Sequence, residues 1–145
     1  MKFSTKAQYG LRAMIELALH HNQGPISVKN IAEQQEISEA YLEQLMRLLI
    51  KRGLVKSLRG AQGGYIIARE PAEIKVSEVI NALEGPVSPV DCVKRENPAE
   101  CSLFGQCVSR IVWEKVRNVI EEALDSLTLQ DLRNELLSRK QSATY

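Results

Sequence analysis

Apolar residues recur every three or four positions through most of the chain, and this spacing predicts helices. Three helices are expected in the first third: one after Ser4, a short one after Ser27, and one from Ser38 to Arg52. Serine is a preferred N-cap, because its hydroxyl accepts a hydrogen bond from an unpaired N–H of the first turn. Gly53 then stops the third helix. The chain is therefore predicted to open as a helical unit.

The hydrophobic pattern changes after the third helix. Two short segments, "LVKSL" and "YIIA", flank a glycine-rich turn from Gly60 to Gly64, which is typical of a β-hairpin. A small helix over 76–84 follows. The next segment, residues 90–108, lacks periodicity, and prolines lie before and within it. We call residues 90–108 the cysteine segment, because all three cysteines of the chain lie in it.

A long amphipathic helix is predicted over 108–127, where apolar residues keep helical spacing over several turns. Such a helix needs an apolar partner. Thr128 and Asp131 form the capping pattern of a final helix, "TLQDLRNELLSR", and the tail "KQSATY" is expected to fray. The predicted fold class is mainly α with a small two-stranded β-wing: a winged helix-turn-helix plus a long C-terminal helix.

Composition narrows the class of protein. A chain of 145 residues with 44% hydrophobic and 5% aromatic residues suggests one domain with an aliphatic core. No apolar run is long enough for a membrane span, and Arg12 and Glu16 interrupt the first helix, which argues against a signal peptide. We therefore expect a cytoplasmic protein.

Charge is unevenly distributed, although the net charge is only +1. No acidic residue occurs from Gln44 to Arg69, and a locally basic segment in a neutral protein indicates an anionic partner. The basic residues of this run are Arg47, Lys51, Arg52, Lys56, Arg59 and Arg69.

This basic run coincides with the predicted helix-turn-helix and wing, in which the second helix enters the major groove of DNA. Arg47 and Lys51 can neutralise phosphates, and Arg59 can reach a narrow minor groove. Gln44 can pair with a base edge, and Glu43 can accept from a cytosine amino group. The alternative is an ordinary solvated helix face. The predicted set for binding double-stranded DNA is Ser38, Ala40, Tyr41, Glu43, Gln44, Arg47, Lys51, Arg59, Gly60 and Gln62.

The three cysteines of the chain, Cys92, Cys101 and Cys107, all lie in the cysteine segment with the spacing C-x8-C-x5-C. In a reducing cytosol such a cluster indicates metal ligands or redox sensors rather than a disulfide. Thiolates are the soft ligands that iron–sulfur clusters prefer, while the paired short spacings of structural zinc sites are absent. A bare thiol switch stays open, and so does zinc held by the three cysteines with a water or a carboxylate.

The segment "SEAYLEQLMRLLIKRGLVKSLRGAQGGYIIARE" resembles the DNA-binding core of the bacterial IscR-type regulator family, with its "YLEQL" helix and "GLV…S.RG..GGY" wing. "STKAQYGLRAM" and "VSEVINALEGPV" extend the resemblance to about Leu132. It implies a homodimer held by the helix at 108–127 and a roughly palindromic operator. The expected organisation is a regulator domain over 1–132, with its DNA-binding part at 27–70 and its cysteine loop at 90–108, then a helix end and tail over 133–145.

Some members of this family ligate an iron–sulfur cluster and others do not. The three cysteines resemble those of cluster-binding members such as IscR and NsrR, and they argue against the cysteine-metabolism repressor CymR, which lacks such a set. The resemblance favours a 2Fe–2S cluster, with 4Fe–4S possible.

The fourth ligand is not predicted. Arg110 stands where relatives carry a ligating histidine, and Gln8 stands where others carry a carboxylate from the other subunit. An exogenous ligand, Glu96, Glu100 or Gln8 stays open. The two histidines, His20 and His21, lie at the far end of the first helix and are poor candidates.

The sequence thus predicts a transcriptional regulator whose operator binding depends on an iron–sulfur cluster. The alternative is a cluster-free, thiol-redox-sensing repressor with the same DNA contacts. An enzyme is not expected, because no nucleophile–base set is present and "RGAQGGY" lacks the lysine of a phosphate-binding loop. A cluster carrier or electron-transfer protein is a further alternative. The basic segment without acidic residues at 44–69 argues against it, because such a protein has no need to bind DNA.

Overall fold

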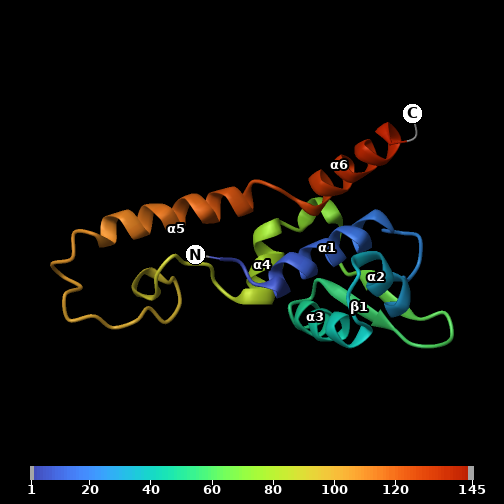
Figure 1. The fold of residues 1–145 in the computed structure, drawn as a ribbon, viewed down its shortest axis with the longest axis horizontal. Helices are drawn as coiled ribbons and strands as arrows, with labels where there is room; N and C mark the ends of the chain where they lie inside the picture. Colours follow the sequence, from blue (N-terminus) through green and yellow to red (C-terminus); the bar gives the residue numbers. More distant parts are fainter. Residues whose placement is uncertain (1, 144–145) are drawn as a thin grey trace.

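The structure is a computed structural model that describes residues 2–143, and it confirms the predicted fold class (Figure 1). Six α-helices accompany one antiparallel two-stranded sheet in this described part. None of the described helices has the length and apolarity needed to cross a membrane. The elements are α1 Thr5–Leu19, α2 Val28–Gln35, α3 Glu39–Lys51, β1 Val55–Leu58, β2 Gly64–Ile67, η1 Pro71–Glu73, α4 Val76–Glu84, η2 Asp91–Val93, α5 Arg110–Asp125 and α6 Leu129–Ser142.

The first three helices begin where the sequence predicts. The hydroxyls of Ser4, Ser27 and Ser38 each accept a hydrogen bond from the backbone N–H three residues later, at 3.1 to 3.3 Å. Each hydroxyl satisfies a donor that the helix itself leaves unpaired. The caps therefore fix the start of α2 and of α3, the two helices of the helix-turn-helix.

The core lies between α1, α3 and α4 and is built from aliphatic side chains, as the low aromatic content predicts. Gly10 of α1 has no space for a side chain, because a Cβ there would lie 2.3 Å from a methyl carbon of Leu83 on α4. This close approach lets α4 pack tightly on α1. The largest fully buried side chains on the helix-turn-helix are Ile31, Leu42, Leu45, Met46 and Leu49.

The wing is an antiparallel hairpin in which Val55 pairs with Ile67 and Leu58 pairs with Gly64. Ile26, in the connection before α2, adds an isolated bridge to Tyr65 through two backbone hydrogen bonds of 3.0 and 2.9 Å. Gly64 is required here, because a Cβ at this position would lie 2.1 Å from the carbonyl oxygen of Ile26. The hairpin is thus attached to the helical body on one edge.

Helix α5 projects from the body, and no residue of it is buried (Figure 1). Its C-terminal end is attached to α4 by two backbone hydrogen bonds of 2.9 Å, Val76 N to Leu127 O and Leu129 N to Ile74 O. The exposed apolar residues of α5 form a stripe along one face, which Val108, two residues before the helix, extends. Exposed fractions are 75% for Val108, 56% for Ile111, 52% for Val112 and 63% for Val119.

Two local predictions need correction. The tail "KQSATY" is not frayed from its start, because α6 continues through Ser142. Arg139 pairs with Glu135 at 3.0 Å, one turn earlier, which supports the last turns of the helix. Residues 144–145 lie outside the described range. The cysteine segment also contains a 3₁₀ turn, η2, which the missing periodicity did not predict.

Candidate nucleic-acid interface and cysteine segment

Helix α3 separates its two faces as predicted. Leu42, Leu45 and Leu49 are buried, whereas Glu43 and Arg47 on the opposite side are exposed. Gln44 and Lys51 are exposed with them. The polar face is therefore free to meet a ligand, while the apolar face holds the helix in place.

Two members of the predicted DNA-binding set also serve the fold. The hydroxyl of Ser38 accepts from the Tyr41 N–H as the cap of α3. Tyr41 is half-buried: its hydroxyl donates to Thr5 Oγ1 at 3.3 Å, and its ring meets the edge of Tyr9 with centroids 6.2 Å apart. Ala40 is exposed. Tyr41 therefore joins α3 to the start of α1.

The tip of the wing is open. Arg59, Gly60 and Gln62 are all exposed, and Gly60 has a φ of +111° that favours glycine. Gly63 N–H donates to Gly60 O at 3.0 Å and closes the turn. The predicted minor-groove residue Arg59 thus lies at the tip of the hairpin, next to the end of β1.

The run from Gln44 to Arg69 contains no acidic residue, but in the structure an acidic residue from outside the run lies beside it, because Arg69 is paired. Its guanidinium donates to Glu78 Oε1 at 2.8 Å and to Glu73 O at 2.7 Å. Burial alone would raise the pKa of Glu78, but the hydrogen bonds from Arg69 and from the Lys75 N–H outweigh it and lower that pKa. The remaining cations of the run are exposed and form no ion pair within residues 2–143: Arg47, Lys51, Arg52, Lys56 and Arg59.

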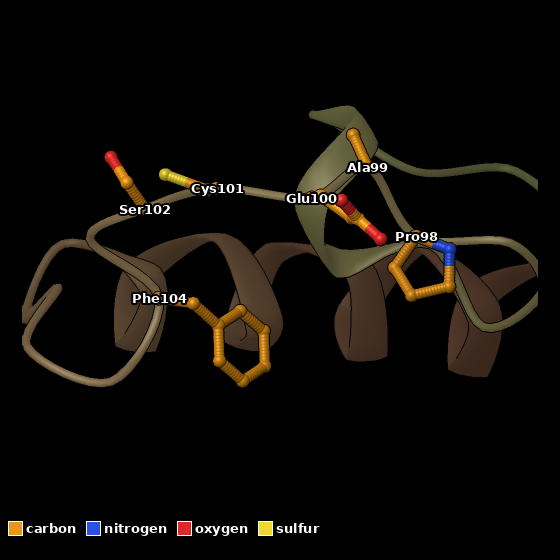
Figure 2. Close-up of a pocket in the computed structure, with 6 residues that line it drawn as sticks. All are labelled: Pro98, Ala99, Glu100, Cys101, Ser102 and Phe104. Carbon is orange, nitrogen blue, oxygen red and sulfur yellow. The ribbon is translucent and has the colours of Figure 1, made fainter.

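The three cysteines are free thiols in different environments. Cys92 is half-buried in η2, Cys101 is exposed in the loop, and Cys107 is half-buried just before α5. Figure 2 shows the Cys101 thiol on the far side from the Glu100 carboxylate, at the edge of a cavity of about 580 Å³. Among the described residues no three His, Cys, Asp or Glu side chains are close enough to hold a metal. The structure therefore does not bring the three thiols together.

Cys107 has the most polar surroundings. Its Sγ lies 3.1 Å from Ser109 Oγ. The hydrogen bond from Ser109, the N–H of Arg110 and the charge of Arg110 lower the pKa of the Cys107 thiol. Arg110 itself lies over the Phe104 ring, 3.7 Å from the centroid, and pairs with Glu114 at 2.9 Å. Arg110 is thus used for packing and an ion pair.

The other candidate ligands are dispersed. Gln8 donates to Phe3 O at 3.1 Å. His21 pairs with Glu70 at 3.1 Å, and His20 contacts Glu16 O at 3.0 Å. Both histidines follow α1 and line a cavity together with wing residues. In Figure 1 this end of α1 lies far from the segment between α4 and α5 that carries the cysteines. Glu96 and Glu100 are exposed within the segment itself.

A polar network that the sequence did not predict attaches η2 to α5. Arg117 Nη1 donates to Val93 O at 2.7 Å, and Val93 is only 2% exposed. Arg95 donates to both carboxylate oxygens of Glu121, the shortest contact being 2.9 Å, and to Asn118 Oδ1 at 3.0 Å. The i, i+4 spacing of Arg117 and Glu121 predicts an ion pair along one face of a helix. It does not predict that Arg95, which lies outside the helix, also binds Glu121.

A sequence profile described as "Rrf2: Iron-dependent Transcriptional regulator" matches residues 3–135. The chain belongs to the Rrf2 family. Its Bacillus subtilis relative CymR is 48% identical over 132 residues, covering 91% of this chain and 89% of CymR. IscR of Photorhabdus laumondii is 38% identical, covering 92% of this chain and 80% of that protein.

Solved Rrf2 structures agree with this assignment. The structure of B. subtilis CymR, described as a global cysteine regulator, superposes with a TM-score of 0.77 at 46% identity, covering 93% of this chain and 98% of CymR. T. potens IscR gives a TM-score of 0.74 at 50% identity, covering 94% of this chain and 88% of that one.

These relatives confirm a winged-helix Rrf2 transcriptional regulator and the prediction that the chain is not an enzyme. The relatives include both CymR and IscR proteins. The three cysteines argued against a likeness to CymR, and the 48% identity to CymR shows that this argument does not separate the two. The cluster, its ligands and the individual DNA contacts stay predictions.

Proposed function

We propose that this Rrf2 protein binds a two-fold operator as a homodimer and that an iron–sulfur cluster on Cys92, Cys101 and Cys107 changes its DNA affinity. The observation that carries the proposal is the gathering of all three free thiols on one segment, directly before the exposed helix α5. The iron-dependent character of the family profile supports it.

The donor set fits such a cluster, although the thiols are apart in this structure. Thiolates are soft ligands, and an irregular segment can wrap a cluster where a helix could not. Cys101 lies in a loop without a helix or strand, and Cys92 lies in a 3₁₀ turn of only three residues, so these parts of the segment can change position. When bound, the cluster would supply iron that responds to oxidants and to iron–sulfur supply. A fourth ligand is not assigned.

Helix α3 carries the DNA contacts in this proposal. Arg47 and Lys51 neutralise phosphates, Gln44 and Glu43 meet base edges, and Arg59 at the wing tip enters the minor groove. Ser38, Ala40, Tyr41, Gly60 and Gln62 surround these contacts. The five exposed cations without an ion pair support this face over an ordinary solvated one, since most such faces alternate their charges.

The homodimer is proposed to form through the apolar stripe of α5. Val112 and Val119 are more than half exposed, and an exposed stripe of this kind marks an interaction surface. Pairing of two α5 helices would place two α3 helices on half-sites about 34 Å apart. Val119→Glu should give monomers in sedimentation, whereas Glu114→Gln, on the opposite face of the same helix, should leave the dimer intact.

Anaerobic purification tests the cluster. We expect coloured protein with visible absorbance and with iron and sulfide in equal amounts. Cys101→Ala should abolish the colour, and the neighbouring Ser102→Ala should not. Loss of the cluster should change operator affinity about 5- to 150-fold, the usual range of allosteric coupling. Colour that survives Cys101→Ala, or iron-free protein, would disprove the assignment.

A second function, a cluster-free thiol switch, is supported by the exposed thiol of Cys101 and by the lowered pKa of Cys107, since thiolates react faster with oxidants. It predicts colourless protein whose operator affinity changes on mild oxidation, and Cys107→Ser should remove that response.

A further inference from the structure

The 3₁₀ turn η2, which carries Cys92, is docked on the middle of α5. Val93 is buried at the contact, and its carbonyl oxygen accepts from Arg117. Arg117 has a side chain only 13% exposed, and its guanidinium also donates to Asn118 Oδ1. Arg95 reaches the same region from the other side of η2 and binds Glu121 and Asn118. We call Arg95, Arg117, Asn118 and Glu121 the latch.

The latch occupies one face of α5 and leaves the other free. Arg117 and Glu121 are one turn apart, on the face that also carries the Arg110–Glu114 ion pair. Val112 and Val119 lie on the opposite face, because a helix has 3.6 residues per turn. Docking of η2 is therefore compatible with pairing of two α5 helices, and both can exist in one dimer.

The docked position keeps two cysteines apart. Cys107 precedes the first turn of α5, whereas the residue next to Cys92 is bound at Arg117, two turns further along. At a rise of 1.5 Å per residue, Arg110 and Arg117 are about 10 Å apart along the helix axis. Ligands of one cluster lie within a few ångströms of each other, so docking of η2 at Arg117 opposes the binding of Cys92 and Cys107 to the same cluster.

We propose that Arg95 and Arg117 are positioning residues that hold Cys92 away from Cys107, and that the latch opens when the three thiols converge. The opening of the latch rests on the function proposed above, because the three thiols converge in order to bind the cluster. Cys107 is bound to a continuous helix by its backbone, whereas η2 is held by side chains, of which Arg95 is 56% exposed. The side chains are the weaker attachment, so η2 is the part that moves.

Alkylation of the three thiols in reduced, metal-free protein tests the latch without any cluster. Rates measured by mass spectrometry should be slowest at Cys92. Arg117→Ala removes a charged hydrogen bond to a buried carbonyl and should raise the Cys92 rate roughly tenfold. Arg95→Ala removes an exposed ion pair and should raise it about two- to fivefold. The Cys101 rate should not change.

Matched variants separate a latch from a general loss of structure. Lys115→Ala removes an exposed cation of the same helix that is not part of the latch, and it should leave all three rates unchanged. The double variant Arg95→Glu with Glu121→Arg should restore slow alkylation that each single variant loses. An unchanged Cys92 rate in both Arg95→Ala and Arg117→Ala, in protein that melts as the wild type does, would overturn the proposal.

Reconstituted protein gives a second measurement, the loss of visible absorbance to an iron chelator. Because the latch competes with convergence, Arg95→Ala should slow this loss about two- to fivefold. Faster or unchanged loss would mean that docked η2 is the ligating form, and the proposal would be wrong. If no variant ever takes up a cluster, the proposed function fails, but the alkylation result still decides the latch.

Discussion

Replacing Arg47 by alanine should lower the salt dependence of operator binding by a predictable amount. Five cations per protomer, Arg47, Lys51, Arg52, Lys56 and Arg59, are exposed and without an ion pair in the described chain. If all contact phosphates in a dimer, log K should fall with log salt with a slope of about −9, at roughly 0.9 per contact. Arg47→Ala removes two contacts per dimer and should give a slope of about −7.

The assay is fluorescence anisotropy of an operator duplex in increasing potassium chloride. Between about 50 and about 200 mM salt, the wild type should lose about tenfold more affinity than Arg47→Ala does. Affinity for unrelated duplexes should fall in parallel, because phosphate contacts carry no sequence information.

Arg69→Ala is the matched control, since Arg69 belongs to the same basic run but is bound to Glu78 and Glu73. Its slope should equal that of the wild type. An unchanged slope in Arg47→Ala, or an equal drop in Arg69→Ala, would refute the assignment of the α3 face to phosphate binding.

Three further predictions concern the scaffold. Leu45→Ala, at a side chain 1% exposed, should lower the free energy of unfolding by about 2–5 kcal/mol in urea denaturation, whereas Ile50→Ala, 38% exposed on the same helix, should cost less than about 1.5 kcal/mol. Gly64→Ala should lower both the melting temperature and operator affinity, because its Cβ would collide with Ile26 O, and Gly105→Ala, where a Cβ meets nothing within 4 Å, should change neither. Glu78 has a folded pKa below its ordinary value of 4.5, so its charged form stabilises the fold above that pH and the contribution disappears as pH falls through the folded pKa. Glu78→Gln should therefore melt below the wild type at neutral pH, and the two melting curves should converge in acid.

The parts of the fold that could be predicted from sequence are those with a local physical cause. Ser27 and Ser38 cap helices that they directly precede, and Gly60 adopts the positive φ of the turn that joins the two wing strands. Apolar spacing predicted both the buried face of α3 and the exposed stripe of α5, because periodicity depends only on helix geometry. The polar face of α3 followed from the same periodicity.

The parts that could not be predicted depend on contacts between distant residues. Arg69 counted as a free cation in the sequence, yet it pairs with Glu78 across the start of α4. Arg95 and Glu121 are 26 residues apart, and no local pattern links them. The docking of η2 was missed for this reason, and with it the separation of Cys92 from Cys107. The proximity of the three cysteines in sequence did not show how far apart they are in the fold.

The attachment of α5 at its C-terminal end makes it a lever. Hydrogen bonds at Leu127 and Leu129 form a pivot at the start of α4, and Cys107 lies just before the opposite end of α5. The arm has 16 residues and is about 24 Å long, so a tilt of about 10° would displace its tip by about 4 Å. That displacement is close to the roughly 3.4 Å between successive base pairs. We expect tilting to shift two paired recognition helices out of register with their half-sites, and unchanged distances between spin labels on the two wings before and after thiol oxidation would contradict it.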